Sequence, residues 1–225
     1  MSIANNLTEI KSQLPTHVTL VAVSKTKPVS DLMEAYNAGQ RIFGENKIQE
    51  MTEKWEQMPK DIEWHMIGHV QTNKVKFMSE YVSLIHGVDS LKLLEEINKQ
   101  AKKHNRVINC LLQIHIAEEE TKFGLNEEEL NEILNQVQNN NEFQNIKIVG
   151  LMGMATFTEN QSQIENEFKH LKSIFDAIRR DAINRVSNQN TDFTILSMGM
   201  SGDYKLAISC GSTMVRIGSS IFGSR

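Results

Sequence analysis

The sequence predicts an α/β fold, namely a single closed (β/α)8 barrel of the TIM type with one extra helix at the N-terminus. Short apolar segments alternate with amphipathic stretches, a rhythm typical of parallel sheets. Eight such units fit within 225 residues, which favours a closed barrel over an open doubly wound sheet. No linker rich in Pro, Gly or Ser divides the chain, so residues 1–225 are expected to form one domain.

The expected helices carry start and stop signals. The extra helix covers residues 3–13. Pro28 suits the first turn of a helix over 29–38, and Gly39 ends it. Asp89-Ser90 can cap a helix over 91–103, and apolar residues at helical spacing predict another over 161–180.

The expected strands are the short apolar runs between these segments. They cover residues 19–23, 41–43, 63–66, 83–86, 109–116, 146–152, 193–196 and 214–217. The second and the eighth are very short, and they are the weakest part of the pattern.

Composition excludes several classes of function. With 40% hydrophobic residues, 23% charged residues and a net charge of -4, the chain is an ordinary globular protein and not a nucleic-acid binder. It has neither a signal-peptide pattern nor an apolar run long enough for a membrane, which predicts a cytoplasmic protein without a membrane partner. Cys110 and Cys210 are expected to be reduced core thiols. We expect a monomer.

Unusual residues cluster at the C-terminal ends of the strands, where (β/α)8 barrels have their active sites. The segment 197–203 follows strand seven, and 216–220 follows strand eight. Both segments combine glycines and hydroxyls just before helices, so backbone N–H groups there could hold an anion such as a phosphate. One such turn would be weak evidence, but two in the last two units are stronger.

Lys25 comes directly from the end of the first strand. Apolar surroundings lower the pKa of an amine, and a neutral amine can form a Schiff base with a carbonyl compound. Strand parity places Val21, Val23 and Lys25 on one face of the first strand, and the same count places Met214, Arg216 and Gly218 together on the last. Lys25 is the better candidate, and Lys27 is a lesser possibility. The competing interpretation is a solvated surface lysine.

The remaining titratable residues have ordinary explanations. Lys122, near the end of strand five, could accept a cofactor transiently, although a solvated charged loop explains it as well. His65 and His69 are four residues apart but straddle Gly68 at a strand exit instead of lying on a helix, and no H-E-x-x-H pattern surrounds them, so no metal is expected. His86 and His115 lie in apolar strands, which is typical of core histidines with satisfied hydrogen bonds.

The motifs together resemble one family. The segments are Val23-Ser24-Lys25-Thr26, Phe43-Gly44-Glu45-Asn46, the run from Trp64 to Lys74, Gly150-Leu151-Met152, Ser197-Met198-Gly199-Met200-Ser201 and Arg216-Ile217-Gly218. They closely resemble the pyridoxal phosphate homeostasis proteins, which are relatives of the N-terminal domain of alanine racemase. The resemblance runs from about residue 3 to the C-terminus.

The resemblance implies a role for each matching residue. It implies that Lys25 forms the internal aldimine with pyridoxal 5'-phosphate, that Asn46 lies in the segment lining the cofactor ring, and that Arg216 stands beside the pyridine nitrogen. The phosphate would be held by Ser197, Met198, Gly199 and Ser201 after strand seven, and by Gly218 and Ser219 after strand eight. Many relatives have threonine at the position of Ser219, which keeps the hydroxyl.

Three functions compete. The first is a protein with little or no catalytic activity that binds pyridoxal phosphate reversibly and delivers it to apo-enzymes. The second is a racemase or related enzyme acting on amino acids, but the chain ends after the eighth unit, without the β-domain of alanine racemase. The third is a Schiff-base aldolase without a cofactor. A cation beside the pyridine nitrogen opposes ring protonation, which favours the first.

Overall fold

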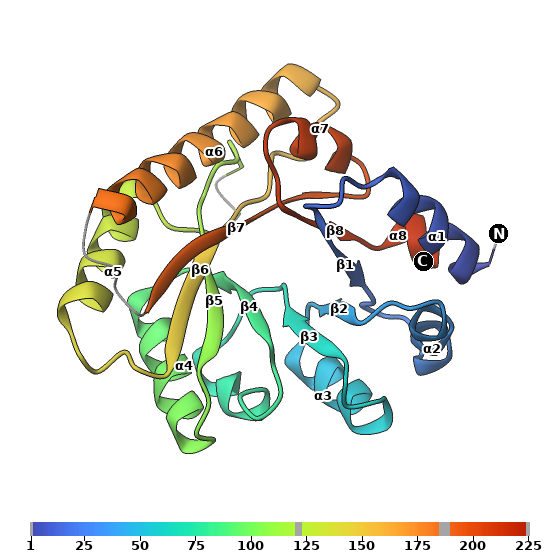
Figure 1. Ribbon diagram of the computed structural model, residues 1–225, viewed down its shortest axis with the longest axis horizontal. Coiled ribbons are helices and arrows are strands. Elements are labelled where there is room, and N and C mark those ends of the chain that lie inside the picture. The colour runs from blue at the N-terminus through green and yellow to red at the C-terminus, as the bar shows by residue number, and fades with distance from the viewer. Residues whose placement is uncertain (1, 120–122, 185–189, 224–225) are drawn as a thin grey trace.

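Eight parallel strands close into a barrel in sequence order, with β1 beside β8 (Figure 1). The computed structural model describes residues 2–119, 123–184 and 190–223, with the backbone alone for 181–184. The strands are β1 (Thr19–Val23), β2 (Ile42–Glu45), β3 (Glu63–Met66), β4 (Leu84–Val88), β5 (Ile108–Gln113), β6 (Ile146–Met152), β7 (Thr191–Met200) and β8 (Met214–Ile217). The predicted closed barrel is confirmed.

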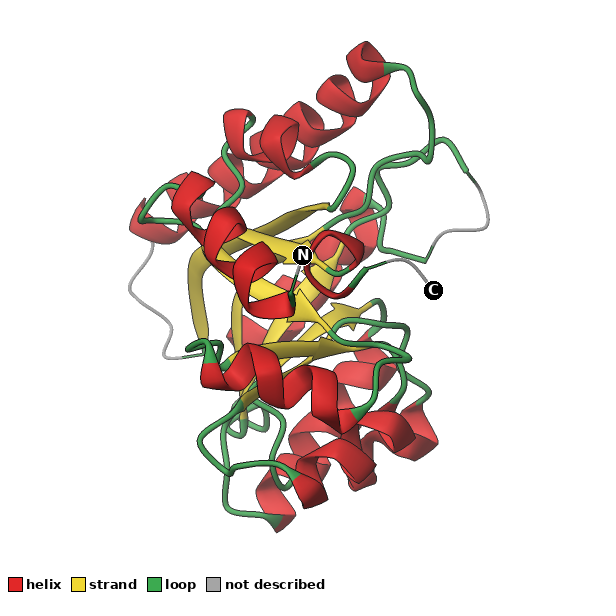
Figure 2. Ribbon diagram, turned by 90° about the vertical axis from the view of Figure 1, so that its right-hand side faces the viewer, coloured by secondary structure: helices red, strands yellow, loops and turns green. Residues whose placement is uncertain are grey.

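Helices surround the strands on the outside, as the two perpendicular views show (Figures 1 and 2). They are α1 (Ile3–Gln13), α2 (Val29–Asn37), α3 (Ile48–Gln57), the 3-10 helix η1 (Thr72–Phe77), α4 (Leu91–Lys103), α5 (Glu127–Asn139), α6 (Gln161–Asn184), α7 (Tyr204–Ser209) and α8 (Ser219–Phe222). None of these described helices is long and apolar enough to cross a membrane.

The extra helix α1 packs against both α2 and α8. The Asn6 side chain donates a hydrogen bond to the Ile221 carbonyl at 3.0 Å, and the Ala4 N–H donates to Glu34 at 3.1 Å. Because α8 has only four residues, α1 supplies the outer layer beside the last strand and holds α8 in place. The first and last helices therefore lie side by side in Figure 1.

Most expected boundaries hold, and the differences have physical reasons. The strands at 19–23, 63–66, 146–152 and 214–217 and the helices at 3–13 and 91–103 match the prediction. Strand β7 continues to Met200 instead of ending at 196, because its pairing with β6 and β8 extends beyond its apolar run. Strand β5 ends at Gln113 instead of 116, since Ile114 leaves the strand and bridges to Leu125.

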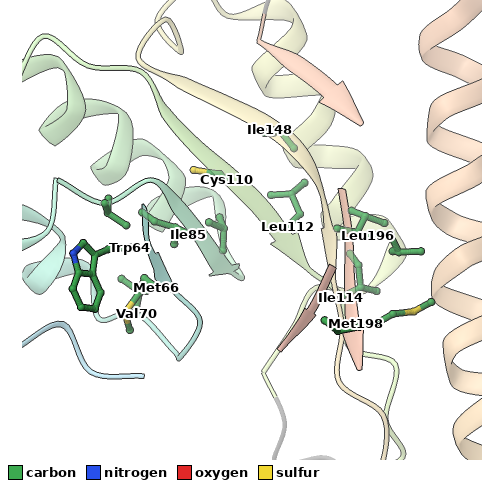
Figure 3. Packing of buried hydrophobic residues seen from close by; sticks show 14 of the residues in the cluster. Trp64, Met66, Val70, Ile85, Cys110, Leu112, Ile114, Ile148, Leu196 and Met198 are labelled. Carbon is green, nitrogen blue, oxygen red and sulfur yellow. The ribbon is translucent and has the colours of Figure 1, made fainter. Parts of the chain in front are cut away.

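The core has an inner and an outer layer. Inside the barrel, Val21, Leu84, Leu111, Val149, Met152 and Met214 form a small apolar cluster. A larger cluster fills the space between strands and helices and contains Trp64, Ile85, Cys110 and Leu196 (Figure 3). Both cysteines are buried free thiols, as predicted.

Candidate functional site

Lys25 lies two residues beyond the end of β1, at the mouth of the barrel. Its side chain is half-buried, and its Nζ makes no hydrogen bond or ion pair within the part of the chain that the structure describes. Val21, which has the same strand parity as Lys25, belongs to the inner apolar cluster. An amine held above an apolar layer without a protein partner is available to a ligand.

Lys27, the lesser candidate, is engaged elsewhere. Its Nζ donates to the carbonyl of Phe222 at 2.9 Å, which ties the loop after β1 to the last helix. This contact favours Lys25 over Lys27 as the reactive amine. Lys122 lies outside the described residues.

A buried ionic cluster supports the loop that carries Lys25. Lys54 of α3, only 5% exposed, donates to Glu45 at 2.7 Å, to Glu50 at 2.7 Å and to the Ser24 carbonyl at 2.8 Å. The Ser24 hydroxyl also donates to Glu45, at 2.6 Å. Burial raises the pKa of Glu45, while Lys54 opposes this effect. Sequence reasoning missed this cluster, although Glu50 and Lys54 have the spacing of a helical ion pair.

Arg216 of β8 is buried inside the barrel, at 3% exposure. Its guanidinium donates to the Ser197 carbonyl at 2.9 Å, to the Ser197 hydroxyl at 2.6 Å and to the Gly153 carbonyl at 3.1 Å. These bonds use three of its five N–H groups, and the other two have no acceptor within the described residues. Burial lowers the pKa of Arg216 to about 10, so it remains a cation at neutral pH.

Two buried histidines continue this network across the barrel. His86 lies 3.1 Å from the Ser197 hydroxyl on one side and 3.1 Å from His65 on the other. These contacts are satisfied together when the Ser197 oxygen accepts from Arg216, the Ser197 hydroxyl donates to His86 Nδ1, and His86 Nε2 donates to His65 Nδ1. Burial lowers the pKa of His65 to about 3 and that of His86 well below its usual value, so both are neutral.

No metal centre is evident here. In residues 2–119, 123–184 and 190–223, no group of three or more His, Cys, Asp or Glu side chains could hold a metal ion. His69 instead lies 3.1 Å from Asp89 and stacks on Phe123 with ring centroids 4.0 Å apart.

The segments after β7 and β8 meet beside β1. The Gly218 N–H donates to the Ser201 hydroxyl at 3.2 Å, which joins the two segments. A side chain at Gly218 would meet the Val23 carbonyl at 3.1 Å, so the glycine lets this segment approach the strand that delivers Lys25. Ser219 is exposed, and its N–H lacks an intrahelical acceptor because it begins α8.

The expected position of Ser197 needs correction. Ser197, Met198 and Gly199 were expected in a loop, but they lie within β7. The Ser197 side chain is fully buried and bound by Arg216 and His86, and Met198 packs in the outer apolar layer (Figure 3). Both side chains are thus engaged within the protein, whereas the backbone groups of this stretch lie next to the turn that contains Ser201.

Gly199 bends the end of β7. Its φ of +97° is in the left-handed region, which a side chain disfavours, and the register between β7 and β8 shifts between Ser197 and Met200. The bend leads directly into the turn that contains Ser201.

Asn46 follows β2 and lines a cavity of about 590 Å³ beside the mouth of the barrel. Its backbone packs against Gly68, where a side chain would meet the Asn46 carbonyl oxygen at 2.4 Å. The cavity continues between α3 and η1, with Met66 and His69 among its lining residues.

The residues at the mouth fit pyridoxal phosphate. Lys25 offers an amine without a protein partner, and Ser201, Gly218 and Ser219 offer small, polar surroundings for a phosphate. Arg216 has donors without a protein acceptor, and guanidinium N–H groups suit an unprotonated pyridine nitrogen. The aldehyde, the phosphate and the pyridine nitrogen of the cofactor therefore each have a matching group at the mouth.

Comparisons with known proteins point to one family. The family model described as the alanine racemase N-terminal domain matches residues 1–225. The pyridoxal phosphate homeostasis protein of Haemophilus influenzae is 37% identical over 100% of this chain and 97% of its own length. The one of Aquifex aeolicus is 39% identical over 92% of this chain and 86% of its own.

Solved structures show the same similarity. PipY of Synechococcus elongatus without PLP has 34% identity and a TM-score of 0.90, with 99% of this chain and 100% of that one covered. Its form with PLP bound has a TM-score of 0.88. Alanine racemase of Clostridium difficile shares the fold, with a TM-score of 0.78 at 16% identity, but this chain covers only 56% of it.

Proposed function

Because the chain belongs to the family of pyridoxal phosphate homeostasis proteins, we propose that it binds pyridoxal 5'-phosphate as a reversible Schiff base on Lys25. In this role it holds the cofactor for intracellular vitamin B6 homeostasis and has little or no catalytic activity. The aldehyde of free pyridoxal phosphate is reactive, which gives a carrier a chemical purpose.

Lys25 supplies the covalent contact. In its deprotonated form the amine would attack the aldehyde carbon, a C=N bond would replace the C=O bond, and one molecule of water would leave. Hydrolysis reverses the reaction and returns both the free amine and the aldehyde. The amine is half-buried and has no protein partner among the described residues, so it can react without first breaking an ion pair.

The other predicted site residues bind the rest of the cofactor without covalent bonds. Ser201, Gly218 and Ser219 contribute hydroxyl and N–H donors to the phosphate, together with the backbone of Met198 and Gly199. Asn46 lines the ring. Ser197 acts indirectly, because its side chain holds Arg216.

Arg216 orients the ring and sets its electronic state. A permanent cation beside the pyridine nitrogen opposes ring protonation, so the bound cofactor is a weak electron sink. A weak sink suits storage of the cofactor better than the carbanion chemistry that racemisation requires.

The contact of Gly218 with Val23 is the observation that carries this proposal. It brings the segment of the proposed phosphate site against the strand end that delivers Lys25. Residues 23 and 218 are far apart in sequence, and the fold brings them together. An amine beside hydrogen-bond donors for an anion matches the aldehyde and the phosphate of pyridoxal phosphate.

Borohydride trapping tests the proposal. Reduction of the protein incubated with pyridoxal phosphate should give a stable adduct, which peptide mass spectrometry assigns to Lys25. Lys25→Ala should abolish the adduct, whereas Lys27→Ala should keep it. A colourless protein, or an adduct that survives Lys25→Ala, would overturn the proposal.

Delivery and assembly complete the proposal. We infer that the protein is a monomer and contacts recipient apo-enzymes only transiently. Analytical ultracentrifugation should give a single species near 25.6 kDa. An apo-enzyme mixed with the loaded protein should gain the cofactor without forming a stable complex, and a stable complex would contradict this view.

A further inference from the structure

The two peptide groups on either side of Lys25 are both anchored to one helix. The carbonyl of Ser24 accepts a hydrogen bond from Lys54 of α3 at 2.8 Å. The N–H of Thr26 donates to Glu50, one turn earlier on the same helix, at 2.5 Å. The first group precedes the Lys25 Cα and the second follows it, so α3 restrains both backbone dihedrals of Lys25.

The anchors are themselves fixed. Lys54 is 5% exposed and binds Glu45 and Glu50 at 2.7 Å each, and Glu45 holds the Ser24 hydroxyl at 2.6 Å. A buried ammonium between two carboxylates has little freedom, because losing either partner would leave a charge unpaired away from water.

The backbone at Thr26 is in a strained conformation, which the contacts with α3 help to hold. Thr26 has a φ of +62°, a left-handed conformation that a β-branched residue rarely adopts. Such conformations persist only where the surroundings enforce them. Here the contacts are the bond from the Thr26 N–H to Glu50 and the bond from the Lys27 N–H to the Ser24 carbonyl, at 3.1 Å, which closes the turn.

We propose that Lys54, with Glu45 and Glu50, is a positioning residue that aims the Lys25 amine at the incoming aldehyde. This inference rests on the proposed function. The cluster contacts no ligand directly and acts only through the loop from Ser24 to Thr26. Losing it should slow Schiff-base formation, while non-covalent binding of the phosphate, which depends on the segments after β7 and β8, should persist.

The first test removes the ammonium and keeps the aliphatic stem. In Lys54→Met, stopped-flow absorbance should show adduct formation slowed by about tenfold, because an attacking group that is poorly oriented reacts slowly. The dissociation constant for pyridoxine 5'-phosphate, which lacks the aldehyde, should stay within about twofold of wild type. A parallel loss of both would mean general structural damage and would overturn the proposal.

A second variant guards against misfolding. Glu50 is partly exposed, so Glu50→Gln should fold, and it should slow adduct formation by a smaller factor. Glu165→Gln is the matched control, because Glu165 also pairs with a lysine one helical turn later, Lys169, but on the exposed face of α6. The control should react at the wild-type rate.

The apo-protein offers an independent measurement. Amide hydrogen exchange at Thr26 should be faster in Lys54→Met and Glu50→Gln than in wild type, and Lys54→Arg should restore part of the protection and of the rate. Unchanged exchange together with unchanged rates would overturn the proposal. If wild type itself forms no adduct on Lys25, the proposed function fails, and the exchange measurement still reports on the cluster.

Discussion

His86 Nε2 lies 3.1 Å from His65 Nδ1, so two fully desolvated imidazoles share a hydrogen bond inside the barrel. With His86 as the donor, a second proton on His65 would turn its Nδ1 from an acceptor into a donor and break this bond, and a second proton on His86 would place a charge near the Arg216 cation. The network therefore requires neutral histidines, and their pKa values are lowered mainly by burial.

The first prediction concerns the pH dependence of stability. Above about pH 6.5 both histidines are neutral in the folded and unfolded chain, and they contribute no pH dependence. Below it, the unfolded chain binds protons that the folded protein excludes, down to the pKa of about 3 for His65. From pH 7.5 to 5.5 the pair should lower the free energy of unfolding by about 2–3 kcal/mol, as measured by urea denaturation.

Variants separate this pair from other groups. His86→Gln should reduce the loss of unfolding free energy between pH 7.5 and 5.5 by about 1.4 kcal/mol, which is the contribution of one histidine. His17→Gln, at an exposed histidine, serves as the control and should leave the wild-type slope. The same slope in His86→Gln as in wild type would contradict a buried neutral imidazole.

The second prediction concerns Arg216 as a structural cation. Arg216→Met leaves the carbonyls of Ser197 and Gly153 without their donor, and should cost about 3 kcal/mol in the free energy of unfolding of the apo-protein. Arg216→Lys keeps the charge but not the forked geometry, and should recover only part of the loss. Denaturant titration of both variants checks this, and wild-type stability in Arg216→Met would refute it.

The third prediction concerns the bend at the end of β7. In Gly199→Ala the new carbon would lie 2.6 Å from Ala207 Cβ and 3.0 Å from Tyr204 Cα, at a φ of +97°. We expect a loss of about 2–3 kcal/mol in stability, from overpacking and backbone strain. The affinity for pyridoxal phosphate, measured by absorbance titration, should fall by about tenfold, a cost of about 1.4 kcal/mol.

Gly202, in the turn that follows, provides the matched control. A side chain there would meet nothing within 4 Å, and its φ is not in the left-handed region. Gly202→Ala should change stability by less than about 0.5 kcal/mol. If the two alanine variants behave alike, the bend at Gly199 has no special role.

The sequence predicts the barrel well because its strands are apolar runs, and the residues that mark the ends of the helices between them act through contacts with nearby backbone. Pro28, Gly39 and Ser90 mark helix ends through nearby backbone contacts, and the structure confirms the Ser90 cap and the positive φ of Gly39. Lys25 and Ser201 stand out for a similar reason, since strand ends of a barrel converge at one mouth.

The missed features depend on contacts between distant segments. Ser197 bonds to His86, 111 residues away, and nothing near Ser197 signals that β7 extends through it. Lys54 resembles a solvated helix residue, and only packing of α3 against the loop after β1 buries it beside Glu45. Local patterns cannot reveal a partner that the fold brings in from elsewhere.

The last prediction concerns catalysis. Racemisation requires a base on each face of the bound amino acid, and tyrosine is the partner one would seek for Lys25. The chain has three tyrosines. Their hydroxyls lie 2.9 Å from Asp61 for Tyr36, 2.9 Å from Thr52 for Tyr81, and 3.3 Å from Gln13 for Tyr204.

Those contacts place the tyrosine hydroxyls outside the barrel. Asp61 follows α3, Thr52 belongs to α3 and Gln13 ends α1, so each hydroxyl points to a helix or a connecting loop. Burial also raises the pKa of Tyr81 to about 12, which makes it a poor base at neutral pH. If Arg216 stands beside the pyridine nitrogen as proposed, the ring stays unprotonated and acidifies the Cα proton of the bound amino acid only weakly.

Deuterium exchange measures this directly. L-Alanine incubated with the loaded protein in deuterated water should gain deuterium at Cα no faster than with free pyridoxal phosphate plus the Lys25→Ala variant. Chiral chromatography of the same samples should detect no D-alanine above that background. Many turnovers per protein molecule would require a second base and would replace the carrier with an enzyme.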